Sequence, residues 1–255
     1  MNESIKAAIA AHAIAEYPRE AVGFVTSVAG VETYMPCANW AATPTEHFVI
    51  AAEDYARAED AGEIVALVHS HPGAPARPSA ADKAMCEQSG IELWVIVSLG
   101  MQANGSIAVD DWCELVPSGF VAPLIGRQFA HGIHDCYAIV RDWYRLERDV
   151  VLRDFERRDD WWDDGHSSLY LENYRAAGFD DMGAEAELEI GDVLLMQIRS
   201  RNGVPNHAGV YIGDGHFLHH MHGRLSGRAV WGGMWKQCLR TVLRFNGGIS
   251  DGAQG

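Results

Sequence analysis

The chain has 255 residues, of which 48% are hydrophobic and 22% are charged. This composition predicts a folded protein with one large domain or two ordinary ones, and it excludes a disordered chain. The 35 acidic residues outnumber the 20 basic ones, so the net charge is −15. Such a charge argues against nucleic acid and against an anionic membrane surface as partners.

The sequence carries no sign of membrane insertion or secretion. Its apolar runs are all shorter than the ~20 residues of a membrane-spanning helix, and the first residues lack the basic flank and apolar stretch of a signal peptide. The five cysteines are unevenly spaced, which does not fit a disulfide framework. We therefore expect a protein of a reducing compartment with no membrane insertion.

The tripeptide Pro117-Ser118-Gly119 predicts a turn between two domains. The excess of acidic over basic residues is larger before this turn than after it. We predict domains over 1–117 and 118–250, both of the α+β class. The first should contain a helix that starts near Ile5 with Asn2 or Ser4 as its cap, strands over 22–28, 64–68 and 93–99, and a helix over 79–89.

The second predicted domain opens with a helix over 136–147, whose apolar residues recur at helical spacing. The segment 153–165 is charged and contains two tryptophans, and we expect it to be a partly exposed, solvated helix end. Strands follow over 193–197, 208–212 and 216–220. The glycines of 213–215 predict a hairpin turn between the last two strands.

A zinc site is predicted where the strand over 64–68 ends. His69 and His71 follow it at alternate positions, so both imidazoles project from one face. The loop after them is rich in glycine and proline and can return the chain to Asp82, in the first turn of the next helix. Two histidines, one aspartate and a water form a catalytic zinc site, and zinc lowers the pKa of such a water to ~7. Glu20, just before the first strand, is the candidate general base.

This pattern resembles the JAMM (JAB/MPN+) metalloprotease family. The resemblance covers roughly residues 1–115 and comprises Glu20 within Glu-x-x-Gly-Phe, His69-Ser70-His71-Pro72, Ser79 and Asp82. It implies a mixed β-sheet with flanking helices and cleavage of peptide or isopeptide bonds. It also implies that His69, His71 and Asp82 ligate Zn²⁺, that Glu20 deprotonates the water, and that Ser79 hydrogen-bonds the water or the oxyanion.

A cysteine nucleophile is predicted in the second domain. Cys136 opens a helix, where backbone N–H groups and the helix dipole favour the thiolate and predict a lowered pKa. His207 begins a strand, and His219 lies on the next strand of the predicted hairpin. Cys136 as nucleophile, His207 as base and His219 as the orienting group follow the logic of cysteine peptidases. His220 and His222 compete with His219 for the third role, although strand alternation favours His219 over His220.

The sequences around these residues resemble the NlpC-type cysteine peptidases over about residues 120–245. The matching stretches are Asp135-Cys136, His207-Ala208-Gly209-Val210-Tyr211 and Phe217-Leu218-His219. The resemblance implies a papain-like α+β fold and hydrolysis of γ-D-glutamyl bonds in peptidoglycan stem peptides. The usual Asp-Cys-Ser-Gly is replaced here by Asp135-Cys136-Tyr137-Ala138, and the tyrosine common upstream of the cysteine is not evident.

The combination of both domains resembles the tail assembly proteins of lambda-like phages. This implies a bifunctional peptidase needed in tail assembly, with phage tail tip proteins as partners and peptidoglycan stem peptides as the substrate. It also implies that the protein acts in the host cytoplasm, with the tail tip of the virion as an alternative location. Two other functions stay open, namely a non-catalytic scaffolding factor and a host peptidase that recycles cell wall in the cytoplasm.

Overall fold

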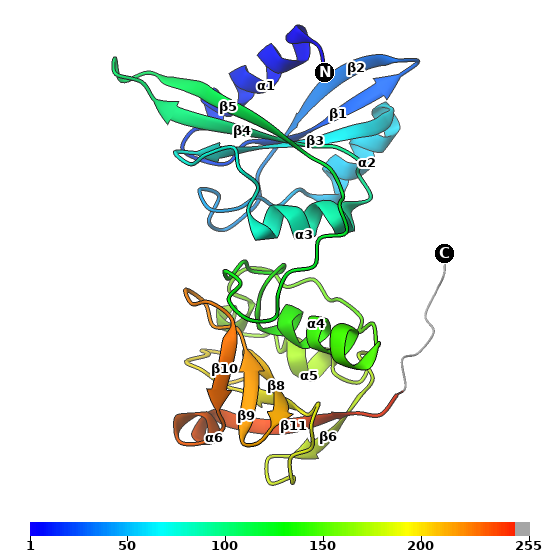
Figure 1. The fold of residues 1–255 in the computed structure, drawn as a ribbon, viewed down its shortest axis with the longest axis vertical. Helices are drawn as coiled ribbons and strands as arrows, with labels where there is room; N and C mark the ends of the chain where they lie inside the picture. Colours follow the sequence, from blue (N-terminus) through cyan, green and yellow to red (C-terminus); the bar gives the residue numbers. More distant parts are fainter. Residues whose placement is uncertain (248–255) are drawn as a thin grey trace. The chain divides into compact units, whose positions relative to one another are not determined.

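The computed structural model describes residues 1–247 (Figure 1). The chain divides into two compact units, Met1–Val121 and Ala122–Gly255. The domain bounds 1–117 and 118–250 stay a prediction, and residues 248–250 lie outside the described residues. Within the described residues, no helix is both long and apolar enough to cross a membrane.

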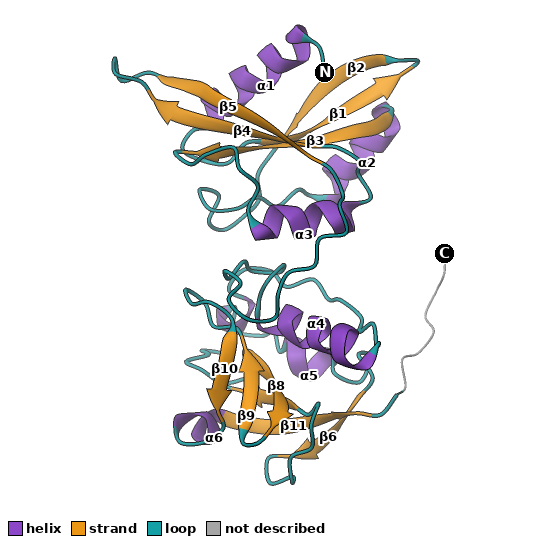
Figure 2. Cartoon of the chain, viewed as in Figure 1, coloured by secondary structure: helices purple, strands orange, loops and turns teal. Residues whose placement is uncertain are grey.

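The first unit is a five-stranded sheet with helices on both faces (Figure 2). The sheet order is β2-β1-β3-β4-β5, and β3 and β4 are parallel whereas the other neighbours are antiparallel. Its elements are α1 (Glu3–Glu16), β1 (Val22–Val28), β2 (Val31–Cys37), α2 (Ala52–Ala61), β3 (Glu63–Pro72), α3 (Ala80–Ser89), β4 (Trp94–Met101) and β5 (Ile107–Leu115).

Both faces of the central strands are buried, which explains their continuous apolar sequence. On β3, Ala66 and Val68 pack in the cluster that contains Ile5 and Ile9 of α1. Leu67 points to the opposite face and packs with residues of α2 and α3. Because side chains alternate along a strand, His69 and His71 share the face of Leu67 and point to the side of α3.

The second unit is a six-stranded antiparallel sheet in the order β10-β9-β8-β7-β11-β6. Helix α4 packs against β8 and β9. The elements are α4 (Cys136–Arg148), the short 3-10 helix η1 (Trp161–Asp163), α5 (Leu169–Asn173), β6 (Phe179–Gly183), β7 (Val193–Met196), β8 (His207–Gly213), β9 (His216–His219), β10 (Gly227–Val230), α6 (Met234–Cys238) and β11 (Leu239–Phe245). The α+β fold class is therefore confirmed for both units.

Helix α4 is fixed at both ends and along one face. The Asp135 side chain caps its N-terminus by accepting hydrogen bonds from the backbone N–H groups of Tyr137 and Ala138. The helix ends at Asp149, which adopts the left-handed conformation. Between these ends, Ile139, Val140, Trp143 and Tyr144 recur at helical spacing and are buried in the core of the second unit.

The predicted exposure of segment 153–165 is wrong for Trp161. Its side chain is 5% exposed, and it contacts the rings of Trp162 and Tyr170 edge-on. The surrounding aspartates suggested a solvated segment, but burial of a large aromatic surface outweighs the polarity of its neighbours. Trp161 is therefore buried, whereas the other residues of this segment are exposed or half-buried.

Candidate functional sites

The end of β3 and the start of α3 bring three predicted metal ligands together. The Nε2 atoms of His69 and His71 are 3.1 Å apart. The two carboxylate oxygens of Asp82 lie 3.2 Å from His69 Nε2 and 3.4 Å from His71 Nε2. Among the described residues, His69, His71 and Asp82 form the group whose possible ligand atoms lie close enough together to hold one metal ion.

These distances fit the donor set of a zinc ion. Zinc binds histidine nitrogen and carboxylate oxygen at about 2.0–2.2 Å, so a tetrahedral site has edges of about 3.3 Å. The distance between the two imidazole nitrogens and the distance from each of them to one Asp82 oxygen match such an edge. His71 is also held in the correct orientation, because its Nδ1 lies 2.8 Å from the carbonyl oxygen of Pro75, which leaves Nε2 free to bind the metal. His69 Nδ1 is buried without a hydrogen-bond partner within residues 1–247.

Ser79 orients Asp82 through a capping box at the start of α3. The Ser79 hydroxyl oxygen accepts a hydrogen bond from the Asp82 backbone N–H at 3.0 Å, and the Ser79 backbone N–H donates to Asp82 Oδ2 at 2.7 Å. The second bond ties the carboxylate to the helix end. Ser79 therefore lies beside the ligand cluster, and its hydroxyl hydrogen is left for the predicted contact with water or an oxyanion.

The charges of the three ligand residues depend on one another. Burial favours the neutral form of Asp82, but hydrogen bonds with His69 and His71 outweigh it and hold the pKa of Asp82 well below its usual value. Burial lowers the pKa of His69 despite that contact. For His71 burial also opposes the charge, but the hydrogen bonds to Asp82 and to the Pro75 carbonyl oxygen, together with the charges of the nearby carboxylates, outweigh it, and the pKa of His71 is raised. The Asp82 side chain therefore stays ionised beside the two imidazoles.

Glu20 is buried beside this cluster, directly before β1. Burial raises its pKa to about 8, while the nearby charge of His71 lowers it and that of Asp82 raises it. A carboxylate whose pKa lies near neutrality is suited to exchange a proton with a water. A bound cation would lower this pKa again.

Asn39 holds the backbone of Glu20 and was missed by the sequence analysis. Its side-chain nitrogen donates to the carbonyl oxygens of Glu20 at 3.0 Å and His47 at 3.0 Å. Its side-chain oxygen accepts hydrogen bonds from the backbone N–H groups of Ala41 and Val49. The buried side-chain amide of Asn39 therefore fixes the loop after β2 to the backbone of Glu20. An asparagine after a strand is a common turn signal, so nothing in the sequence distinguished it.

In the second unit, Cys136 is the first residue of α4. The hydroxyl group of Tyr170, on α5, lies 3.1 Å from the Cys136 sulfur. The backbone of Ala208, the residue after His207 on β8, also lowers the pKa of this thiol. Groups from α5 and β8 therefore act on the sulfur. Tyr170 lies 34 positions after Cys136 in the chain, and no sequence motif around Tyr170 predicts this contact.

The hairpin of β8 and β9 brings His207 and His219 together. His207 Nε2 lies 3.0 Å from His219 Nδ1, and the ring of Trp235 contacts both imidazoles. This contact leaves Nδ1 as the nitrogen of His207 that can act as a base. His220 is fully buried and contacts the carbonyl oxygen of Arg224, whereas His222 packs against Phe129. The geometry thus favours His219 for the orienting role.

The expected lowering of the Cys136 pKa is contradicted by the structure. Burial, and after it the charge of the adjacent Asp135 carboxylate, raise the pKa of the thiol to about 11. The contacts with Tyr170 and Ala208 lower it only in part. Burial and the neighbouring His219 lower the pKa of His207 to about 3. The free site therefore holds a neutral thiol and a neutral imidazole.

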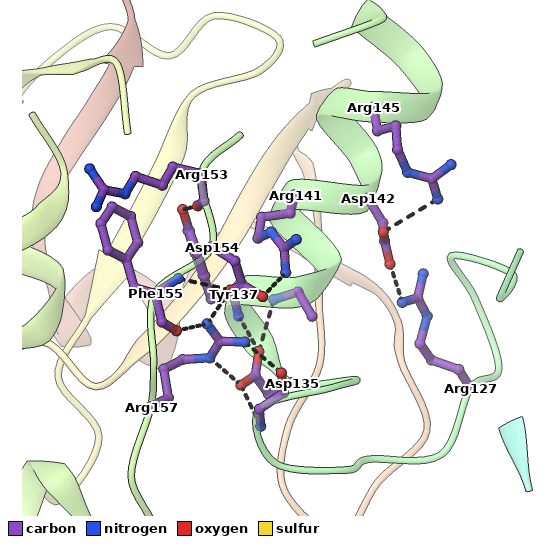
Figure 3. Close-up of polar contacts among 12 residues, drawn as sticks. Arg127, Asp135, Tyr137, Arg141, Asp142, Arg145, Arg153, Asp154, Phe155 and Arg157 are labelled. Carbon is purple, nitrogen blue, oxygen red and sulfur yellow. Dashed lines mark hydrogen bonds and ion pairs between the residues drawn. The ribbon is translucent and has the colours of Figure 1, made fainter. Parts of the chain in front are cut away.

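Asp135 is held by an arginine from the segment that follows α4 (Figure 3). The guanidinium of Arg157 donates from Nε to Asp135 Oδ2 at 2.7 Å and from Nη2 to the Gly132 carbonyl oxygen at 2.8 Å. Its Nη1 donates to Asp154 at 2.7 Å, and Asp154 in turn pairs with Arg141. The sequence predicts a partly exposed, solvated helix end here, because a run of mixed charges is typical of an exposed surface.

Comparison with known proteins agrees with the two folds. The model of prokaryotic homologs of the JAB domain matches residues 2–112, and that of the NlpC/P60 family matches residues 126–244. A solved NlpC/P60 domain of the peptidoglycan hydrolase SagA covers 48% of this chain and 90% of its own, with 14% identity and a TM-score of 0.32.

Two curated relatives match most of the chain. The tail tip assembly protein K of Escherichia phage N15 is 37% identical over 246 residues, which cover 96% of each chain. The tail tip assembly protein K of Escherichia phage lambda is 40% identical over 192 residues, which cover 75% of this chain and 87% of the relative. The chain therefore belongs to the tail tip assembly protein K family.

Proposed function

We propose that the protein is a bifunctional peptidase that acts in the assembly of a phage tail tip. The observation that carries this proposal is that one unit contains the Cys136 sulfur, its hydrogen bond with Tyr170 and the His207–His219 pair. The names of the two relatives support the role in tail assembly. Tail tip proteins are then its partners, and the host cytoplasm is where it acts.

The second unit would cleave an amide bond through a thioester. Cys136 gives its proton to His207 while the sulfur bonds to the carbonyl carbon, and His207 then passes the proton to the amine as the C–N bond breaks. His207 next deprotonates a water that hydrolyses the thioester and restores the thiol. His219 accepts a hydrogen bond from His207 Nε2–H and so keeps Nδ1 available as the base.

The substrate of this site would be a peptidoglycan stem peptide. The match to the NlpC/P60 family supports this choice. The acidic surface does not oppose it, because the thiol acts on a local amide and not on a polyanion. No organic cofactor is required for either hydrolytic step.

The first unit would cleave a peptide or isopeptide bond in another tail protein. His69, His71 and Asp82 would hold Zn²⁺, which when bound supplies a Lewis acid for the scissile carbonyl and for water. Glu20 would take a proton from the water and deliver it to the leaving amine. Ser79, beside Asp82, would donate a hydrogen bond to the developing oxyanion.

The test is digestion of purified muropeptides and of candidate tail proteins by wild type, Cys136→Ala and Glu20→Gln. Muropeptide cleavage should vanish in Cys136→Ala and persist in Glu20→Gln, and cleavage of a tail protein should show the opposite pattern. Complementation of a phage that lacks the gene measures the need for each site in tail formation. If wild type cleaves neither substrate and Cys136→Ala supports normal tails, the protein is a scaffold and the peptidase proposal fails.

A further inference from the structure

Arg157 and Asp135 form a buried ion pair one residue from the proposed nucleophile. The side chains of Arg157 and Asp135 are 7% and 2% exposed, and Nε lies 2.7 Å from Oδ2. Besides this bond, the Asp135 carboxylate accepts hydrogen bonds from the backbone N–H groups of Gly132, Tyr137 and Ala138. All of these contacts are made by Asp135, the residue that caps the N-terminus of α4.

The guanidinium is held as firmly as the carboxylate. Figure 3 shows it between Asp135 and Phe155, where it donates to the carbonyl oxygens of Phe155 and Gly132 and to the carboxylate of Asp154. Its plane also lies over the ring of Tyr137, 5.2 Å from the ring centre. An arginine in this setting has one orientation, which a lysine could not reproduce, because a lysine offers no planar fork of donors.

We propose that Arg157 is a positioning residue of the cysteine site, which holds the Asp135 carboxylate and offsets its negative charge beside Cys136. A carboxylate is well suited to cap the helix, but its charge opposes ionisation of the adjacent thiol. The arginine lets the chain keep this cap without the full electrostatic cost to the thiolate. This inference deepens the proposed function, because it rests on Cys136 as the nucleophile.

The directions of the pKa shifts agree with this arrangement. The charge of Asp135 raises the pKa of Cys136, and the charge of Arg157 lowers it. Burial raises the pKa of Asp135, but the charge of Arg157, together with the hydrogen bonds from Arg157 and from the Ala138 backbone, outweighs burial and keeps the carboxylate ionised.

Other groups also face the sulfur or its neighbours. Tyr170 contacts the sulfur from α5. His207 is the neighbour of Ala208 on β8, and Ala208 lowers the pKa of Cys136. His131, in the loop before α4, lowers the pKa of Asp135 through its charge. These groups are left unchanged in the test below, so the effect of the ion pair can be isolated.

The test is the rate at which iodoacetamide alkylates Cys136 in the full chain, followed at about pH 8 by peptide mass spectrometry. An opposite charge nearby shifts a pKa by about one unit or more. A rise of one unit leaves about tenfold less thiolate, which is about threefold more nucleophilic, so the rate falls about threefold. We expect R157M to react about threefold more slowly than wild type and D135N to react about threefold faster.

The double variant D135N/R157M separates electrostatics from structure. Both charges are absent, so its rate should return to that of wild type. If Arg157 only supports the fold, the double variant should be as impaired as R157M, because both lack the arginine, and that result would overturn the inference. R153M is the matched control, since Arg153 lies on the same segment over the ring of Phe155, and its rate should not change.

The inference stays testable if R157M does not fold. D135N and D135N/R157M differ only in the arginine, so faster alkylation of D135N supports the inference and equal rates overturn it. Circular dichroism of each variant shows which of them are folded. The alkylation assay needs no substrate. A wild type that fails to cleave muropeptides would therefore refute the proposed function and leave this result interpretable.

Discussion

The hydroxyl group of Tyr170 lies 3.1 Å from the sulfur of Cys136, although 34 positions separate the two residues. Burial and the neighbouring sulfur keep the pKa of Tyr170 well above its usual value. The tyrosine therefore retains its proton under conditions where the thiol ionises, and it donates a hydrogen bond to the thiolate. This donor partly offsets the burial that opposes ionisation of Cys136.

Replacement of Tyr170 by phenylalanine should slow the cysteine peptidase. Tyr170→Phe keeps the ring, which lines an apolar cavity, and removes only the hydrogen bond, which for a charged acceptor contributes about 1.5–3 kcal/mol. We expect kcat/KM on a muropeptide to fall at least about tenfold, with Tm nearly unchanged. Tyr174→Phe is the control, because its hydroxyl contacts Arg175 and not the sulfur. Full activity of Tyr170→Phe would contradict the assigned contact.

His219 should be required for the same reaction, because it fixes the orientation and tautomer of His207. His219→Ala removes the partner of Nε2 and should reduce kcat by about 100-fold or more, as loss of an orienting group does in other triads, while KM changes little. The control is His222→Ala, whose ring packs against Phe129 and should be dispensable. If His222→Ala is the inactive variant instead, the third role belongs to that residue.

Local signals predicted much of the fold. Asn2, one of the two caps that the sequence offered, caps α1, because a cap depends on neighbours within one turn. The glycines of 213–215 produced the β8–β9 hairpin that pairs His207 with His219. The strands β2 and β5 escaped prediction, since each lies at a sheet edge with a largely unburied pattern.

Contacts between distant segments could not be read from the sequence. Tyr170, Arg157 and Asn39 each lie in stretches whose local composition is ordinary, and their roles exist only after the chain has folded. The pKa of Cys136 shows the same limit. A helix N-terminus favours the thiolate, but burial and Asp135 reverse that preference, and the extent of burial is a property of the whole unit.

Loss of one zinc ligand should leave the second site intact. His71→Ala removes one of the three residues of the predicted metal site, so zinc content should fall from about one equivalent to nearly none, because structural and catalytic sites need their full ligand set. The rate of Cys136 alkylation should stay as in wild type. Elemental analysis and alkylation of the same sample provide both readouts, with His12→Ala as a control in the same unit. Joint loss of zinc and thiol reactivity would indicate one shared site.

The loop beside Glu20 should depend on a single amide. Asn39→Ala leaves the carbonyl oxygens of Glu20 and His47 and the N–H groups of Ala41 and Val49 without their partner. Each buried group left unsatisfied costs about 1–3 kcal/mol, and with some rescue by water we expect about 3 kcal/mol lower free energy of unfolding, measured in urea. Asn104→Ala, in an exposed turn, should cost far less. Equal stability of the two variants would refute this role.

The activity of the cysteine site should persist in mild acid. A histidine acts as a base only when it is neutral, and burial together with His219 lowers the pKa of His207 to about 3. The acidic limb of kcat/KM should therefore lie below about pH 5 and not near the ordinary histidine value of 6.5. A profile of initial rates on a muropeptide tests this. An acidic limb centred near pH 6.5 would show that His207 is not the base or that it is charged in the free enzyme.

The stability of the second unit should fall as the pH is lowered from 6.5 to 5. His134 and His207 are buried, with pKa values lowered by burial to about 4 and about 3. Below pH 6.5 the unfolded chain binds protons that the folded chain excludes, so the free energy of unfolding decreases as the pH falls. Each histidine should cost about 2 kcal/mol between pH 6.5 and pH 5. Urea unfolding at both pH values measures the loss, and His134→Gln should reduce it only by the share of one histidine, because burial also lowers the pKa of His219 and of His220. A free energy of unfolding that is the same at both pH values would mean that these histidines are accessible to protons in the folded state.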